Sequence, residues 1–232
     1  MGGNEHVLAL LLVMFSIGIA IGGLCNNSLL KGRVEAVYVP LAALGMTIFS
    51  VDLYFANGDV GIAAGSALLS LESFIAISAH WRIMFDIFMI AFCGGLFVVP
   101  LTAMIQHYTP EEKRARVLAG NAILDALFVI ASSALSFYLI TKGWEIRELF
   151  LAFAVLNGFV ALYICKLLPD YLFKSFMQGL FKILYNVEVR GLENVEKAGN
   201  RAVIVGNHVS LLDPPLLAAF LPGRPMFAVN SF

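Results

Sequence analysis

His208 and Asp213 are the two residues whose types and spacing best suit catalysis, since the aspartate follows the histidine by five positions. A carboxylate beside an imidazole fixes one tautomer of the ring and stabilises the imidazolium that forms when the ring takes a proton. Such a pair suits a general base that deprotonates a weakly acidic hydroxyl as it attacks an acyl carbonyl. The spacing alone is weak, because four histidines and six aspartates would give one such pair by chance about one time in ten.

The surrounding pattern predicts the elements that would hold these two side chains in place. Residues 202–205 are continuously apolar, which predicts a buried strand ending at Gly206-Asn207-His208. Asp213 with the two prolines after it is typical of a helix start, and residues 216–221 would continue that helix. Alternation over 187–192 predicts a short strand into a turn, and 226–229 predicts another strand. This order of elements predicts the start of an α/β domain.

A predicted amphipathic helix, residues 169–185, precedes this segment. Its polar residues recur every four positions among large apolar ones: Asp170, Lys174, Gln178 and Lys182. A helix with one narrow polar stripe suits the membrane interface, with its lysines toward the lipid headgroups. The alternative, a helix packed on the domain that follows, is compatible with this interpretation.

Residues 187–194 and 203–213 together resemble the opening of the glycerolipid acyltransferase family, which is marked by a histidine, four residues and an aspartate. The resemblance implies an O-acyltransferase that moves an acyl chain from acyl-carrier protein or coenzyme A to a hydroxyl of a lysophospholipid or glycerol phosphate. It implies that His208 is the general base and Asp213 its partner, with Asn207 and Ser210 as substrate-binding residues, and no resident cofactor or metal.

The family's later arginine-bearing block and Phe-Pro-Glu-Gly block, which hold the acceptor phosphate, do not occur before Phe232. The segment is therefore expected to be the truncated start of a cytoplasmic α/β acyltransferase domain, residues 186–232, and to be inactive alone.

Composition indicates that the rest of the chain lies in a membrane. Of 232 residues, 60% are hydrophobic and 13% charged, whereas soluble domains are about half apolar and a quarter charged. The net charge of −1 gives no sign of a nucleic-acid partner. Cys25, Cys93 and Cys165 have no metal-ligand spacing, so we expect small buried hydrophobes rather than a metal site or a disulfide framework.

Five apolar stretches predict transmembrane helices, at residues 7–24, 36–56, 83–105, 117–140 and 149–168. No basic segment precedes the first stretch, so we expect a retained span and not a cleaved signal peptide. Five spans place eight basic loop residues on one side and three on the other. By the positive-inside rule, we expect the N-terminus outside and the chain after Leu168 in the cytoplasm. Residues 60–79, with Glu72 in their middle, are then an external interfacial or re-entrant segment.

The membrane part, residues 1–168, is similar to the last five helices of a major facilitator superfamily transporter of the lysophospholipid-transporting kind. The similarity lies in residues 31–33 with 37–45, in 94–101, and in the basic loop through Arg116, Gly120 and Asn121. It implies a fused protein of the bacterial inner membrane in which a lysophospholipid transporter precedes an acyltransferase. The predicted fold is thus a five-helix membrane bundle, a linker helix and an α/β segment.

Polar residues inside the spans are costly and need a reason. Asp125 is expected to face the bundle interior with Asn121 one turn away, either in a transport cavity or as a structural hydrogen-bonding pair. For Asp52 and Asp86 we favour a structural pairing with Arg82. Helices with Gly22-Gly23, Gly45 and Gly94-Gly95 can approach one another closely. Thr109, Pro110 and Glu112 predict a capped helix start.

Three functions remain open from the sequence. The first is a phospholipid-remodelling acyltransferase that acts on lysophospholipid at the lipid bilayer. The second is a lysophospholipid transporter with a degenerate acyltransferase segment, and the third is a membrane-anchored fragment without activity.

Overall fold

The computed structural model describes residues 3–30, 36–59, 68–185, 187–198, 203–206, 210–221 and 226. Asn207, His208 and most of the expected strand at 226–229 lie outside these ranges. The chain divides into two units, Met1–Leu167 and Leu168–Phe232, and each is described by itself.

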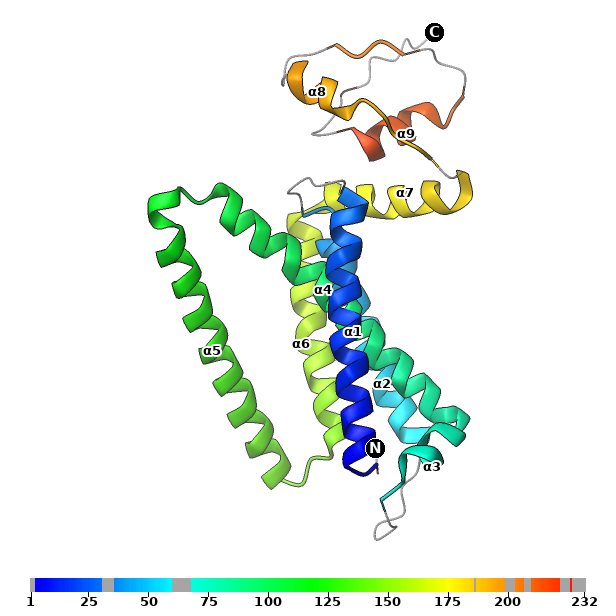
Figure 1. Cartoon of the computed structure of the whole chain (residues 1–232), viewed down its shortest axis with the longest axis vertical. Helices are drawn as coiled ribbons and strands as arrows, with labels where there is room; N and C mark the ends of the chain where they lie inside the picture. Colours follow the sequence, from blue (N-terminus) through cyan, green and yellow to red (C-terminus); the bar gives the residue numbers. More distant parts are fainter. Residues whose placement is uncertain are drawn as a thin grey trace. The chain divides into compact units, whose positions relative to one another are not determined.

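The first unit consists of helices (Figure 1): α1 Glu5–Leu30, α2 Val39–Asp59, α3 Leu71–Ala76, α4 Ser78–Tyr108, α5 Glu111–Thr141 and α6 Ile146–Leu167. All but α3 are long and apolar enough to cross a membrane, judged by length and composition. Each of the five predicted spans falls on one of them, with bounds that agree to within six residues. The unit is therefore consistent with a membrane protein.

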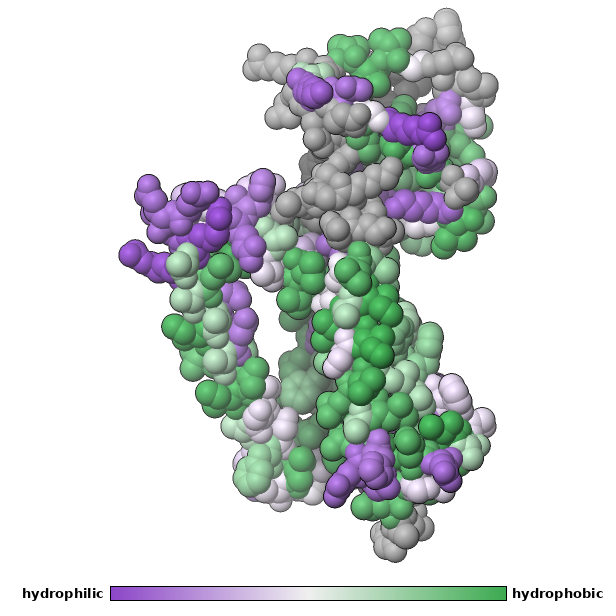
Figure 2. Space-filling view, in the orientation of Figure 1, coloured by the Kyte–Doolittle hydropathy of each residue, from purple (hydrophilic) through white to green (hydrophobic). Residues whose placement is uncertain are grey.

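Much of the surface of these helices is apolar. Leu24 on α1 and Phe128 and Phe137 on α5 are more than 70% exposed. Figure 2 shows hydrophobic residues along the helices, and hydrophilic ones gathered at the turn between α4 and α5. Exposed apolar surface of this extent on helices of this length is the surface that a lipid bilayer covers.

Helices α1 and α4 pack through glycines, as the sequence indicated. A methyl group on Gly18 would lie 2.7 Å from the carbonyl oxygen of Phe88, and one on Gly22 would overlap the carbonyl of Phe92. From the other side, a methyl group on Gly95 would overlap the carbonyl of Ile19. Only hydrogen at these positions lets the two backbones approach so closely, which is how helices gain dispersion contacts in lipid. Gly94, by contrast, faces open space.

The doubtful stretch at 60–79 does not form a spanning helix in the described residues. It ends in α3, six residues long, whose Phe74 is fully buried with Val7 and Met84. His80 stacks on Phe74 at 3.9 Å between ring centroids and bonds to its carbonyl oxygen through Nδ1, at 2.8 Å. At about 1.5 Å per residue, α3 is about 9 Å long and far too short to cross a bilayer.

The predicted capping box at Thr109 is wrong. Helix α4 runs to Tyr108, and Thr109 is its C-cap, with the Thr109 N–H donating to the carbonyl of Ile105. Pro110 therefore occupies the N-cap of α5, where no side chain caps the helix. Glu111 and Glu112 still lie in the first turn, where their negative charge interacts favourably with the positive end of the helix dipole.

The second unit contains α7 Pro169–Tyr185, α8 Leu192–Ala198 and α9 Asp213–Phe220. Helices α7 and α9 match the predicted helices closely, and α8 was not predicted. Gly191 turns the chain into α8 with a φ of +79°, a conformation that favours glycine.

The expected α/β arrangement is not found in the described part of this unit. Residues 187–191 and 203–206 are irregular, and Val203 and Val205 are each 90% exposed, so the prediction of a buried strand there is wrong. A strand is stable only when its backbone bonds to a neighbouring strand, and no ladder forms among the residues described.

The glycine contact yields a stability prediction. Gly95→Ala should lower the free energy of unfolding by about 1–3 kcal/mol, because its methyl group has to push α1 away from α4. Gly94→Ala is the matched control, with its methyl group in open space. Thermal unfolding of the two purified variants in the same detergent measures the difference. Equal melting temperatures would contradict the close α1–α4 contact.

Candidate functional site

The described part of the histidine–aspartate segment is the turn that leads into α9. The Asp213 side chain accepts a hydrogen bond from the Ser210 backbone N–H at 2.9 Å, and the Ser210 hydroxyl accepts one from the Leu212 N–H at 3.2 Å. The Asp213 N–H donates to the Ser210 carbonyl at 3.0 Å. These three bonds close a compact turn, and two prolines then rigidify the first turn of α9.

This turn fixes one oxygen of the Asp213 carboxylate against the backbone. A carboxylate held in this way suits orientation of a neighbouring imidazole, which is the expected role of Asp213. His208 and Asn207 lie outside the described residues, so the distance between His208 and Asp213 stays a prediction. The hydroxyl of Ser210 belongs to the turn, and its predicted role in substrate binding is untested.

Helix α9 packs on α7 within the second unit. Lys174 of α7 is 8% exposed, and its Nζ donates to the carbonyl of Leu221 at 3.0 Å. Gln178 Nε2, one turn along, donates to the carbonyl of Ala219 at 2.8 Å. The expectation that Lys174 points to lipid headgroups is therefore wrong: its ammonium group lies against the C-terminal end of α9, where a positive charge is favoured.

The alternative prediction, that this helix packs on the segment that follows it, is confirmed by these contacts. No sequence signal indicated that Leu221, 47 positions from Lys174, is the partner. The apolar side chains on the other side of α7 remain exposed, Ile183 at 84% and Leu184 at 62%. The helix is thus amphipathic as predicted, with its polar stripe directed at protein along Lys174 and Gln178.

The polar pair in α5 forms one turn of that helix. Asn121 Nδ2 donates to Asp125 Oδ2 at 2.8 Å, as expected for residues four apart. Both side chains are exposed among the described helices, so the expectation that Asp125 faces the bundle interior finds no support there, and the role of the pair in transport stays a prediction. Helix α5 buries no residue in the described chain, because the other helices of the unit do not cover its face (Figure 1).

A shallow cavity of about 620 Å³ lies farther along α5, against α6. Its walls are three serines and three large apolar residues: Ser132, Ser133, Ser136, Phe137, Ile140 and Phe153. The structure therefore does not bring Asn121 and Asp125 into this cavity.

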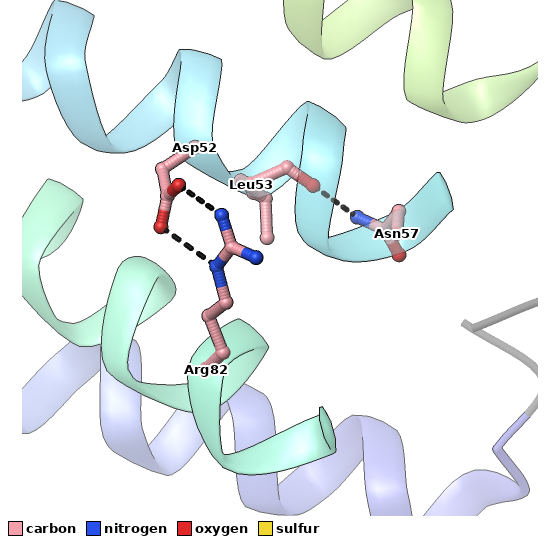
Figure 3. Close-up of polar contacts among 4 residues, drawn as sticks. All are labelled: Asp52, Leu53, Asn57 and Arg82. Carbon is pink, nitrogen blue, oxygen red and sulfur yellow. Dashed lines mark hydrogen bonds and ion pairs between the residues drawn. The ribbon is translucent and has the colours of Figure 1, made fainter. Parts of the chain in front are cut away.

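Other polar groups of the first unit link neighbouring helices. Figure 3 shows Arg82 of α4 holding the carboxylate of Asp52 in α2, with Arg82 Nε donating to Asp52 Oδ2 at 3.1 Å. Asn157 of α6 donates to the carbonyl of Ala43 at 3.1 Å and to the Thr47 hydroxyl at 2.9 Å. Asp86, fully buried, lies one turn from Arg82. The predicted pairing of Asp52 with Arg82 is confirmed, and it joins helices rather than lining a cavity.

Comparison with known proteins bears on the second unit. A family model described as Acyltransferase matches residues 186–231, a range that includes Asn207, His208, Ser210 and Asp213. This segment is similar to acyltransferases. The match covers about a fifth of the chain and supports a transferase activity for the protein. No solved structure matches the chain.

The link between α2 and α4 can be tested by a double-mutant cycle. Asp52→Asn and Arg82→Met remove the two partners, whose side chains are 38% and 45% exposed. For partly exposed groups we expect a coupling free energy of about 0.2–1 kcal/mol. Urea unfolding of the two single variants and the double variant in one detergent measures it. If the two substitutions changed the free energy of unfolding additively, the proposed interaction between Asp52 and Arg82 would be contradicted.

Proposed function

We propose that this protein is a membrane-bound phospholipid-remodelling acyltransferase, fused to a lysophospholipid transporter of the major facilitator superfamily. The observation that supports it most strongly is the acyltransferase match over residues 186–231, which contains the histidine–aspartate spacing and follows α7 in a chain with five helices of membrane-spanning length. The acyl donor is acyl-carrier protein or coenzyme A loaded with a fatty acid, and the acceptor is a hydroxyl of a lysophospholipid.

The chemistry assigned to the pair is general-base acyl transfer. His208 takes the proton of the acceptor hydroxyl while the hydroxyl oxygen bonds to the thioester carbonyl carbon. Asp213 orients the imidazole and stabilises the positive charge that the ring gains. The tetrahedral intermediate then collapses, the carbon–sulfur bond breaks, and the proton passes to the departing thiolate. The products are a diacyl phospholipid and a free thiol. Asn207 and Ser210 contact the acceptor in this scheme.

The bilayer is a partner of the second unit in this proposal. Helix α7 begins at Pro169, two positions after α6 ends at Leu167, so its start lies at the end of a membrane-spanning helix. Its exposed apolar side chains lie on the face away from Lys174 and Gln178: Phe173, Phe176, Leu180, Ile183 and Leu184. An apolar helix face joined this closely to a span suits the lipid interface, on the cytoplasmic side of a bacterial inner membrane.

The alternative function is a lysophospholipid transporter whose acyltransferase segment is degenerate. The observation that favours it is the hydrogen-bonded Asn121–Asp125 pair within a span, where an uncompensated carboxylate costs about 2.5–3.5 kcal/mol. Transport and acylation are consecutive steps if both parts are active.

The catalytic assignment predicts the effect of two substitutions. His208→Ala should lower the rate of acyl transfer to lysophospholipid at least about a hundredfold, because the general base is lost. Asp213→Asn should lower it less, since the amide still orients the ring without its charge. The rate is measured on the full-length protein with radiolabelled lysophospholipid and both acyl donors, with equal amounts of each variant in the membrane. Turnover at the wild-type rate in His208→Ala would remove the histidine from the mechanism.

The transport alternative predicts that Asp125→Asn impairs lysophospholipid uptake into cells. Ser136→Ala, on the same helix but in the separate cavity, is the control. If the Asp125→Asn variant took up lysophospholipid at the wild-type rate, the Asn121–Asp125 pair would have a structural role and no role in transport.

The interfacial placement of α7 predicts selective quenching. An environment-sensitive fluorophore on Ile183→Cys should be quenched by lipids that carry a nitroxide near the headgroup, because Ile183 lies on the exposed apolar face. The same fluorophore on Lys197→Cys in α8 should be quenched far less. The experiment uses protein in nanodiscs with its native cysteines replaced by alanine. Equal quenching at both sites would contradict the placement.

A further inference from the structure

The side chains Lys174 and Gln178 hold the far end of the helix that begins at Asp213. Lys174 donates to the carbonyl of Leu221, the C-cap of α9, and Gln178 donates to the carbonyl of Ala219 in its last turn. The last carbonyls of a helix have no donor within the helix itself, so they require partners from outside. An ammonium group is the favoured partner, because it also opposes the negative end of the helix dipole.

Burial makes this contact specific. Lys174 is 8% exposed and Ser175 is 1% exposed, and Ala219 of α9 is 1% exposed. A lysine is seldom buried to this degree unless its charge is paired or hydrogen-bonded. Removing the donor would leave carbonyl oxygens in a partly buried contact without their partner, which costs more than the hydrogen bond contributed.

Helix α9 transmits this constraint to the motif. It has eight residues, so about 12 Å separates the Lys174 contact from Asp213. Two prolines stiffen its first turn, and the bonds between Ser210 and Asp213 fix the turn before it. The helix is therefore held at both ends, by its own turn at Asp213 and by α7 at Leu221.

We infer that Lys174 and Gln178 are positioning residues for acyl transfer: by fixing the C-terminal end of α9 they hold Asp213, at its other end, in place for its proposed role. This inference rests on the proposed function. It gives α7 a dual role, with Lys174 and Gln178 on the motif helix and the opposite, apolar face on lipid. Neither side chain touches substrate.

The experiment uses the full-length, membrane-embedded protein in nanodiscs, with the variants Lys174→Met, Gln178→Leu, Lys174→Arg and the control Lys197→Met. Met and Leu keep most of the apolar volume and remove the donors, and Arg restores a charged donor. Lys197 is an exposed lysine of α8 in the same unit. Two quantities are measured: hydrogen–deuterium exchange of the α9 amides, and kcat and KM for acyl transfer to lysophospholipid.

In Lys174→Met and Gln178→Leu we expect α9 amides to exchange about tenfold faster, the effect of one lost hydrogen bond. In the same variants kcat should fall about tenfold with KM for lysophospholipid nearly unchanged, because the acceptor contacts are intact. Lys174→Arg should restore most of the slow exchange and most of kcat. Lys197→Met should match the wild type in both quantities.

Unchanged exchange in α9 would overturn the inference, and so would faster exchange with an unchanged kcat. A fall in kcat as large in Lys197→Met would overturn it too, since the effect would then follow charge alone. Absence of acyl transfer in the full-length wild-type protein would contradict the proposed function only. The exchange data would still decide whether Lys174 and Gln178 hold α9.

Discussion

Apolar surface that must be covered by lipid is the constraint on which the rest of the structure depends. The five long helices of the first unit bury only a minority of their apolar side chains against one another, and on α5 they bury none. In water such a surface would drive aggregation, whereas in a bilayer it costs nothing and the backbone bonds are satisfied within each helix. The ends of these helices, and the loops between them, are then confined to the two membrane faces.

Within lipid, helices gain little by burying more apolar surface, so other interactions have to hold them together. Glycines at 18, 22 and 95 let the backbones of α1 and α4 come into contact. Asn157 joins α6 to α2 by hydrogen bonds, and Arg82 joins α4 to α2 through Asp52. Close packing and a few polar links are the two means of association that a bilayer leaves available.

The features that depend on local composition were predictable from sequence, and the features that depend on a distant partner were not. Length and apolar content alone decide a spanning helix, so all five helices were found, with bounds within six residues. The capping box failed because α4 extends to Tyr108 and takes Thr109 for its own end. The strands at 187–192 and 202–205 failed because a strand needs a neighbour, and the apolar pattern does not supply one. Lys174 was assigned to lipid because its stripe gives no sign that Leu221 lies against it.

For the candidate site, the sequence supplied the residue types and the family resemblance, and the structure supplied the turn that orients Asp213. The prolines after Asp213 identified the start of α9 because their effect is local. What fixes the other end of α9 is a contact made through folding of the whole second unit. The proposed catalytic pair thus depends on two levels of organisation, a local turn and a long-range helix contact.

We propose that five spans, an odd number, put the N-terminus and the acyltransferase segment on opposite sides of the membrane. Single cysteines at His6 and Lys197, with Cys25, Cys93 and Cys165 replaced by alanine, test it with a maleimide that does not cross membranes. In intact spheroplasts the account predicts labelling at position 6 and none at 197, with both labelled after permeabilisation. Labelling of both positions, or of 197 alone, before permeabilisation would contradict it.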